Sequence, residues 1–397
     1  MTDSTASIWS LPVCMALVLG LCFRVVFVTA TPFGGPSIPH RLSSYNDEAA
    51  HVRYAAHVMQ HHRLPSAVES ISENGAVERG LYEYYQPPLY YMLLASLGSF
   101  IGAETESELC LIGRWLAVAL GVALIWICIG ICRELNLAPQ PTAAAIMFVA
   151  LGGAFVRFTS MVGNEAMFWM LSGGLIWSLL HMTRWGASLR SVAVFVLLAV
   201  AALYTKLTAL LLLPLLLVLL WRTDGRRAIS GSMLLGGGLV IFLATIPLWM
   251  RNLSVFGGLI PISAGFGPPG LRIPNWSSAA YALRSFVFPW SEFWYGFAGL
   301  LLMLPLSAAF AVAIIRTLSL KDVRLHPVLT AALAISIVAF IALNVRYDQA
   351  EGRYLLLAWP AWCVLLGALP ESPYLPWFLF SALLLPYLLF ALPFLGI

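Results

Sequence analysis

The chain has 397 residues, of which 60% are hydrophobic and only 10% are charged, and its mean hydropathy is +0.87. Because soluble domains carry about 25% charged residues, this composition excludes a soluble protein and indicates a polytopic membrane protein. The apolar runs are long and unbroken, whereas membrane-barrel strands alternate, so we expect an all-α structure. The net charge of +4 is small and its basic residues lie in short loops, which gives no indication of nucleic-acid binding.

Twelve apolar segments are expected to form helices. The first, residues 8–30, lacks a basic start and a cleavage site, so we interpret it as a retained membrane span. Residues 87–102 are fewer than the roughly 20 that a span needs, and we expect them to lie along the interface, leaving eleven spans. The other segments are residues 109–132, 141–159, 166–183, 191–204, 207–221, 228–250, 293–315, 327–343, 354–370 and 374–396.

This arrangement satisfies the positive-inside rule when the N-terminus lies inside the cell. It predicts one domain over residues 1–397, with no soluble C-terminal domain, because the sequence ends soon after the last apolar segment. The basic residues placed on the cytoplasmic side are Arg133, Arg184, Arg190, Arg222, Arg226, Arg227, Arg316, Lys321 and Arg324.

Five polar stretches then share the outer face of the membrane. Ionisable groups near membrane depth are functional candidates by default, and their placement on one face predicts a single site. The stretches are the first outer loop (residues 31–107), residues 158–166, residues 204–206, a lid loop rich in Gly, Pro and aromatics (251–292), and residues 344–353.

The first outer loop begins with SSYNDEAAH, which offers a candidate catalytic carboxylate in Asp47, with Glu48 beside it. One interpretation is purely structural, because Ser44 and Asp47 have capping-box spacing at a helix start. The other is functional, because Asp47, His51 and Tyr54 recur at i, i+4 and i+7 and share one helical face. The two interpretations are compatible.

Four further residues are candidates for an acceptor or sugar pocket together with His51. Tyr85 and Gln86 precede a Pro-Pro pair, where an ordinary aromatic belt is the alternative interpretation. Asn164 and Glu165 lie in a tight loop, where a turn and a helix cap are the alternative.

The candidate phosphate-binding residues are Lys206, Arg251, Arg346, Arg353 and Tyr354. Arginine forks match phosphate oxygens, and outer-face arginines run against the positive-inside bias. Snorkelling of the long basic side chains to the interface is the alternative interpretation.

No metal site is expected from the sequence, although it leaves open whether a divalent metal assists. The histidines of the first loop, at positions 51, 57, 61 and 62, match no metal-binding signature. None of the six cysteines forms a CxxC pair, so neither a disulfide nor a zinc framework is expected.

Taken in chain order, these elements resemble the GT-C superfamily of membrane glycosyltransferases, in the branch of bacterial aminoarabinose transferases and protein O-mannosyltransferases. The resemblance covers about residues 24–362 and departs where Tyr85 and Gln86 replace an acid and a lysine. The matching elements are Asp47-Glu48, Pro87-Pro88-Leu89, Asn164-Glu165, the stretch from Thr205, Trp249 to Asn252, and Gly352-Arg353-Tyr354.

The resemblance implies a GT-C-like transmembrane helix bundle with interfacial juxtamembrane helices in the first outer loop. It implies inverting transfer of a sugar from a polyprenyl-phosphate-linked donor to a lipid, glycan or protein acceptor, on the periplasmic side of a bacterial inner membrane. It also implies that Asp47 acts at the reaction centre and that basic outer-loop residues hold the donor phosphate. The alternatives are a lipid-linked-sugar flippase or transporter, and an O-antigen ligase or polymerase.

Overall fold

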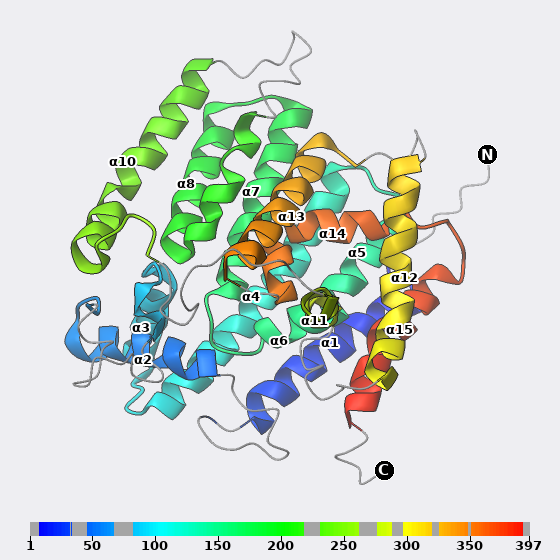
Figure 1. Cartoon of the computed structure of the whole chain (residues 1–397), viewed down its shortest axis with the longest axis horizontal. Coiled ribbons are helices and arrows are strands. Elements are labelled where there is room, and N and C mark those ends of the chain that lie inside the picture. The colour runs from blue at the N-terminus through cyan, green and yellow to red at the C-terminus, as the bar shows by residue number, and fades with distance from the viewer. Residues whose placement is uncertain are drawn as a thin grey trace.

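The computed structural model describes residues 8–31, 33, 46–66, 82–217, 231–261, 276–287, 297–319, 325–347 and 351–391. These residues form α-helices and short 3-10 helices, as the composition predicts (Figure 1). The α-helices are α1 (Leu11–Ala30), α2 (Asn46–His61), α3 (Leu89–Ile101), α4 (Glu106–Glu134), α5 (Pro139–Leu151), α6 (Gly153–Phe158), α7 (Glu165–Trp185), α8 (Leu189–Thr205), α10 (Gly231–Phe256), α11 (Trp276–Val287), α12 (Phe297–Ser319), α13 (Pro327–Tyr347), α14 (Trp359–Leu366) and α15 (Leu375–Ala391), and the 3-10 helices are η2 (Tyr82–Tyr85), η3 (Leu207–Leu212) and η6 (Gly352–Ala358).

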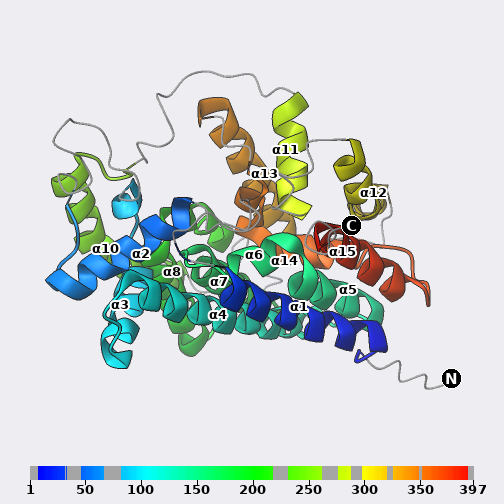
Figure 2. The same ribbon diagram turned by 90° about the horizontal axis from the view of Figure 1, so that it is seen from below.

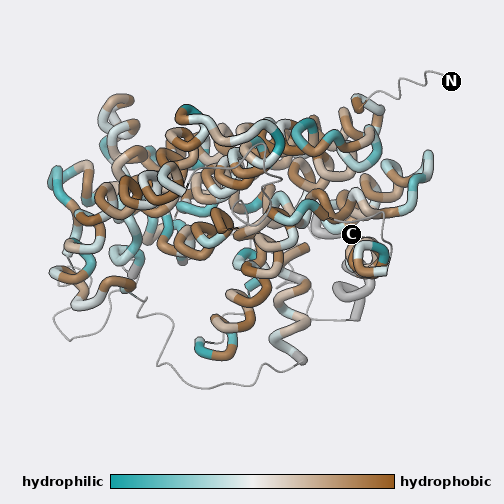
Figure 3. Tube along the Cα trace, turned by 90° about the horizontal axis from the view of Figure 1, so that it is seen from above, coloured by the Kyte–Doolittle hydropathy of each residue, from teal (hydrophilic) through white to brown (hydrophobic). Residues whose placement is uncertain are grey.

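The structure is that of a multi-pass membrane protein. Among the described residues, α1, α4, α7, α10 and α13 are long and apolar enough to cross a membrane, and seven further apolar helices are shorter. Hydrophobic residues run along most of the helices, as Figure 3 shows. The count of eleven spans stays a prediction.

Residues 87–102, which we predict to lie along the interface, contain one short helix. Helix α3 has 13 residues and would extend only about 20 Å, less than the roughly 30 Å hydrocarbon core. Pro88 precedes its first turn, and Gly102 ends it with a left-handed φ of 84°. Helices α2 and α3 pack against each other at one end of the molecule (Figure 1). That α3 does not cross the membrane stays a prediction.

The predicted helix over residues 141–159 is wrong as a single element, because the chain breaks at Gly152 between α5 and α6. The break leaves carbonyl groups at the end of α5 without helical partners. Arg24 of α1 donates to the Ala150 carbonyl at 2.7 Å, and the Tyr387 hydroxyl donates to the Leu151 carbonyl at 2.9 Å. The buried arginine therefore caps a helix end, and α1 lies beside α5 (Figure 2).

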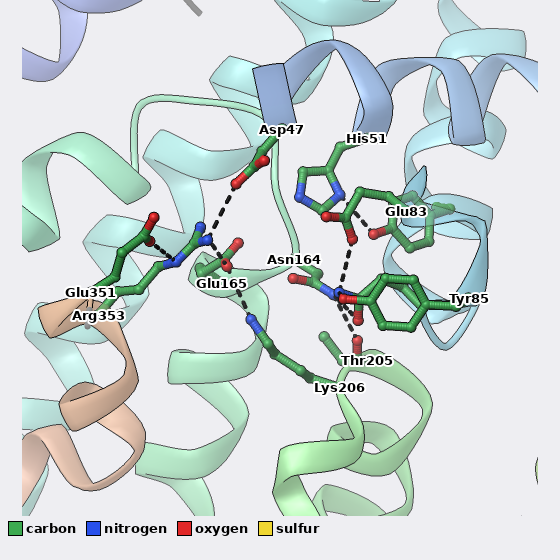
Figure 4. Close-up of polar contacts among 12 residues, drawn as sticks. Asp47, His51, Glu83, Tyr85, Asn164, Glu165, Thr205, Lys206, Glu351 and Arg353 are labelled. Atoms are coloured by element: carbon green, nitrogen blue, oxygen red, sulfur yellow. Dashed lines mark hydrogen bonds and ion pairs between the residues drawn. The ribbon is translucent and has the colours of Figure 1, made fainter. Parts of the chain in front are cut away.

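Two other breaks bring polar residues to one region. Helix α8 ends at Thr205 and η3 follows, so Lys206 lies in an extended conformation between them. The segment predicted at 354–370 begins as the 3-10 helix η6, which includes Arg353, before α14 continues. The start of α7, the end of α8, the start of α2 and η6 meet around these residues (Figure 4).

Candidate active site

Asp47 lies in the first turn of α2 and points toward Arg353 of η6 (Figure 4). One Asp47 carboxylate oxygen lies 3.2 Å from the Arg353 guanidinium, and the two side chains are 17% and 13% exposed. The structure therefore places the predicted catalytic acid in a partly accessible ion pair. Ser44, its predicted capping partner, lies outside the described residues.

Arg353 pairs with three carboxylates. Besides Asp47, it contacts Glu165 at 3.3 Å and Glu351 at 2.6 Å. Its guanidinium also lies 5.3 Å from the ring centre of Tyr354, close enough for a cation–π contact. An arginine so surrounded by carboxylates is well suited to hold Asp47 in place. The sequence alone did not single out Glu351.

Glu165 is shared by two cations. Lys206 donates to Glu165 Oε1 at 2.9 Å, and Arg353 approaches the same oxygen. Gly163 makes this geometry possible, because a Cβ there would lie only 2.9 Å from the other Glu165 oxygen. The tight loop thus places a 6%-exposed carboxylate between two basic side chains.

A chain of amide and phenol groups forms the second wall of the site (Figure 4). The Gln86 amide donates to Glu83 and to the Tyr85 hydroxyl, both at 2.9 Å. The Asn164 amide donates to Gln86 Oε1 at 3.2 Å and to the Thr205 carbonyl at 3.1 Å. Asn164 Oδ1 is buried and has no hydrogen-bond donor among the described residues.

Burial changes the protonation of this wall. It raises the pKa of Glu83 above its usual range, opposed by nearby His51 and reinforced by the negative charge of Asp47. Burial likewise holds the pKa of Tyr85 well above its ordinary value. These shifts favour neutral side chains beside the charged ion pairs.

His51 and Tyr54 lie on the face of α2 that their spacing from Asp47 predicts. His51 Nδ1 lies 2.7 Å from the Tyr91 hydroxyl, and the Tyr54 and Tyr91 rings stack with centres 3.8 Å apart. Burial raises the pKa of Tyr54 to about 12, although the positive charge of Arg251 partly opposes the shift. These contacts fix α2 against α3 and thereby orient the start of α2.

Arg251 has a different environment from Arg353. It donates to the Tyr54 hydroxyl at 3.2 Å and to the Tyr84 carbonyl at 3.0 Å. Its Nε is buried without a hydrogen-bond partner, and no carboxylate among the described residues forms an ion pair with it. Its positive charge is therefore less neutralised than that of Arg353.

Glu48, predicted as a second catalytic carboxylate, faces away from this cluster. Both of its oxygens accept from Arg114, at 2.9 and 2.7 Å, and one also accepts from the Val162 amide at 2.9 Å. The Glu48 and Arg114 side chains are 0% and 3% exposed. This placement corrects the expectation, because a carboxylate so enclosed has no access to a substrate.

Arg346 is also not brought to the cluster by any contact among the described residues. It is exposed in the last turn of α13. Within the described residues, no group of three or more His, Cys, Asp or Glu side chains is arranged to hold a metal ion.

The five polar stretches predicted to share one face do meet, through contacts of Asp47, Asn164, Lys206, Arg251 and Arg353.

Comparisons with known proteins bear on the fold. No protein-family model matches the chain, and no curated protein sequence matches it either.

Solved structures do resemble it. ArnT from Cupriavidus metallidurans bound to undecaprenyl phosphate matches with a TM-score of 0.61 and 18% identity, over 96% of this chain and 63% of that one. The Archaeoglobus fulgidus oligosaccharyltransferase tethered to an acceptor peptide matches with a TM-score of 0.57 and 13% identity, over 94% and 53%. The mycobacterial arabinofuranosyltransferase AftD matches with a TM-score of 0.52 and 15% identity, over 94% and 26%.

These three proteins are GT-C glycosyltransferases, and the chain has their fold. It spans less than two thirds of the length of each of the three. The predicted fold class, an all-α GT-C-like membrane bundle, is confirmed.

Proposed function

We propose that the protein is a glycosyltransferase that moves a sugar from a polyprenyl-phosphate-linked donor to a hydroxyl acceptor. We place the reaction on the outer, periplasmic face of a bacterial inner membrane. The observation that carries the proposal is the ion-paired carboxylate Asp47, which lies at the start of an interfacial helix beside Glu165, Lys206 and Arg353. A donor with its tail in the bilayer presents its sugar at this depth.

In this proposal Asp47 is the general base. It takes the proton of the acceptor hydroxyl as the oxygen attacks the anomeric carbon from the face opposite the phosphate. The carbon–oxygen bond to phosphate breaks, the electron pair leaves with the phosphate, and the anomeric configuration inverts. Arg353 pairs with Asp47 and holds it in position, and such a positioned base contributes about 10²- to 10⁴-fold.

The departing phosphate gains negative charge and needs fixed cations. Arg251 is the strongest candidate, because within the described part of the chain no carboxylate pairs with it and its Nε has no acceptor. Lys206 can assist, because it has a single carboxylate partner. Arg353 completes the basic side of the site, with Tyr354 beside it. Arg353 acts mainly by positioning Asp47.

The sugar or acceptor is proposed to lie against His51, Tyr85, Gln86 and Asn164. Asn164 Oδ1 is a buried acceptor without a donor among the described residues, and an unsatisfied buried group of this kind costs about 1–3 kcal/mol. A substrate hydroxyl or ammonium that donates to it would remove that cost. Glu83, whose pKa burial raises, lies beside Gln86 and adds a further polar group to this wall.

The fold relatives support this class of substrate. One of them is bound to undecaprenyl phosphate and another is tethered to an acceptor peptide. We therefore propose a polyprenyl phosphate carrier for the donor and a lipid, glycan or protein hydroxyl for the acceptor. No metal is invoked for any step.

A flippase is less well supported. It needs polar groups that line a path through the membrane, whereas the buried arginines Arg24 and Arg114 are engaged by other groups of the protein. Arg24 is engaged by carbonyl groups of α5 and by Thr159, and Arg114 by Glu48 and the Thr31 carbonyl.

The test uses the purified full chain in sealed proteoliposomes with radiolabelled polyprenyl-phosphate sugars and a panel of lipid, glycan and peptide acceptors. The proposal predicts labelled product that requires both substrates and disappears in Asp47→Asn. Product with inverted anomeric configuration supports the mechanism. Movement of donor across the bilayer without transfer would instead support the flippase.

A further inference from the structure

A concave site separate from the candidate active site lies at the far end of α4 and α7. Helix α7 begins at Glu165 in the candidate active site and continues for 21 residues, about 30 Å, to Trp185. A groove of about 300 Å³ lies between the C-terminal halves of α7 and α4, which pack against each other. Arg133 and Arg184 line it, at the end that we expect to face the cytoplasm.

The floor of the groove is aromatic. Trp126 and Trp185 are 66% and 60% exposed, and Trp177 is partly exposed. Gly130 allows Trp177 to lie directly on α4, because a Cβ at this position would lie 2.5 Å from the indole ring. Three indoles at the end of two apolar spans form a surface of the kind found at membrane interfaces.

The rim is held by a network of polar contacts. Trp185 donates to a Glu134 oxygen at 2.7 Å, and His181 lies 3.3 Å from the other. Arg184 donates to the Glu134 carbonyl at 2.6 Å and to Asn136 at 3.0 Å, and its guanidinium lies 4.8 Å from the centre of the Trp185 ring. The carboxylate of Glu134 is therefore already paired within the protein, and these contacts hold the rim in place without a ligand.

Arg133 completes the rim and is not neutralised. Its side chain is exposed, and no carboxylate among the described residues pairs with it. The groove thus combines an apolar aromatic floor with an available cation at its mouth. These are the two features that a lipid with a negatively charged headgroup would complement.

We propose that this groove binds an anionic phospholipid, with the phosphate at Arg133 and the first acyl carbons on the three indoles. The chemistry favours an anionic over a zwitterionic headgroup, because the rim offers positive charge without an available carboxylate to match a choline or ethanolamine cation. The volume suits a headgroup and the start of its chains rather than a protein segment. The site is separate from the candidate active site and does not depend on the proposed function.

The test is native mass spectrometry of the detergent-solubilised full chain with dioleoyl phosphatidylglycerol or dioleoyl phosphatidylcholine. A basic residue near an anionic lipid surface contributes about fivefold in binding, so we expect about fivefold tighter binding of phosphatidylglycerol. Arg133→Gln should remove this preference, and Trp126→Ala should weaken binding of both lipids.

Two matched controls share the chemistry but lie outside the groove. Arg190 is an exposed arginine at the start of α8, and Trp115 is a 44%-exposed tryptophan elsewhere on α4. Arg190→Gln and Trp115→Ala should bind both lipids as the unmodified protein does. The proposal is overturned if the unmodified protein does not distinguish the two lipids, or if the controls lose as much binding as the groove variants. The comparison of the two lipids on the unmodified protein requires no variant, so it remains valid even if a variant folds poorly.

Discussion

Asp47 and Glu48 are neighbours in the sequence, but they belong to two different electrostatic regions. Asp47 joins Arg353, Glu165 and Lys206 where four chain segments meet, and its side chain is 17% exposed. Glu48 is fully buried against Arg114, in a pair that ties α2 to α4. A single residue step along the helix, about 100°, thus separates a partly exposed carboxylate from one that is fully enclosed.

This difference shows how structural and catalytic roles can be assigned within a polar cluster. Breaking a pair that is fully buried leaves one charge without compensation, so its loss should appear as instability. Removing a partly exposed carboxylate at a site should affect chemistry more than folding.

The largest effect is expected from Glu48→Gln. The amide leaves the Arg114 charge buried and unpaired, which typically costs about 3–5 kcal/mol of the free energy of unfolding. Thermal unfolding in detergent, followed by tryptophan fluorescence, should show a large loss of stability. Unchanged unfolding of this variant would show that the Glu48–Arg114 pair is not structural.

Arg353→Ala should reduce sugar transfer by about 10- to 150-fold, because a charge-assisted hydrogen bond is worth roughly 1.5–3 kcal/mol. If Arg353 positions Asp47, the loss should appear in kcat. If Arg353 binds the donor phosphate, KM for the donor should rise as well. Arg353→Lys should recover only part of the rate, because a point charge cannot reproduce the guanidinium fork. An unchanged kcat/KM in Arg353→Ala would show that Arg353 has no role in catalysis or donor binding.

Arg251→Gln should weaken donor use by a similar or smaller factor, roughly tenfold, through loss of a contact to the phosphate. Arg346→Gln is the matched control, since Arg346 is exposed at the end of α13. Donor titrations at fixed acceptor should show a higher KM for the first variant and no change for the second. An equal loss in both would return Arg346 to the phosphate-binding set.

The raised pKa of Glu83 leads us to expect a small effect of pH on the free energy of unfolding. Because burial raises its pKa in the folded state, its contribution is fully present below the ordinary pKa of a glutamate and is lost as pH rises through the raised value. Glu83→Gln should therefore flatten the pH dependence of the unfolding temperature above the ordinary pKa of a glutamate. An identical pH profile in variant and unmodified protein would contradict the assignment.

Much of the site could be predicted because topology constrains it. Once the apolar segments and the basic loops fix which ends face outward, polar residues from distant segments are forced to one face. Asp47, Glu165, Lys206 and Arg353 were found in this way. Their mutual contacts confirm that these stretches meet.

The pairing within that face could not be predicted. Glu48 and Arg114 are 66 residues apart, and no local sequence pattern connects them. Glu351 has no sequence signal that distinguishes it from an ordinary loop acid. The break at Gly152 was missed because the apolar pattern runs through it, and its cost is offset by Arg24 from another helix.

The most direct test of the account is the rate of sugar transfer by Asp47→Asn, measured in a preparation whose unfolding temperature matches that of the unmodified protein. The amide keeps the size of the side chain and removes the base. The account predicts that transfer from a polyprenyl-phosphate-linked sugar falls by about 10²-fold or more, while donor binding persists. Near-normal transfer by this well-folded variant would contradict the central claim that Asp47 is the base.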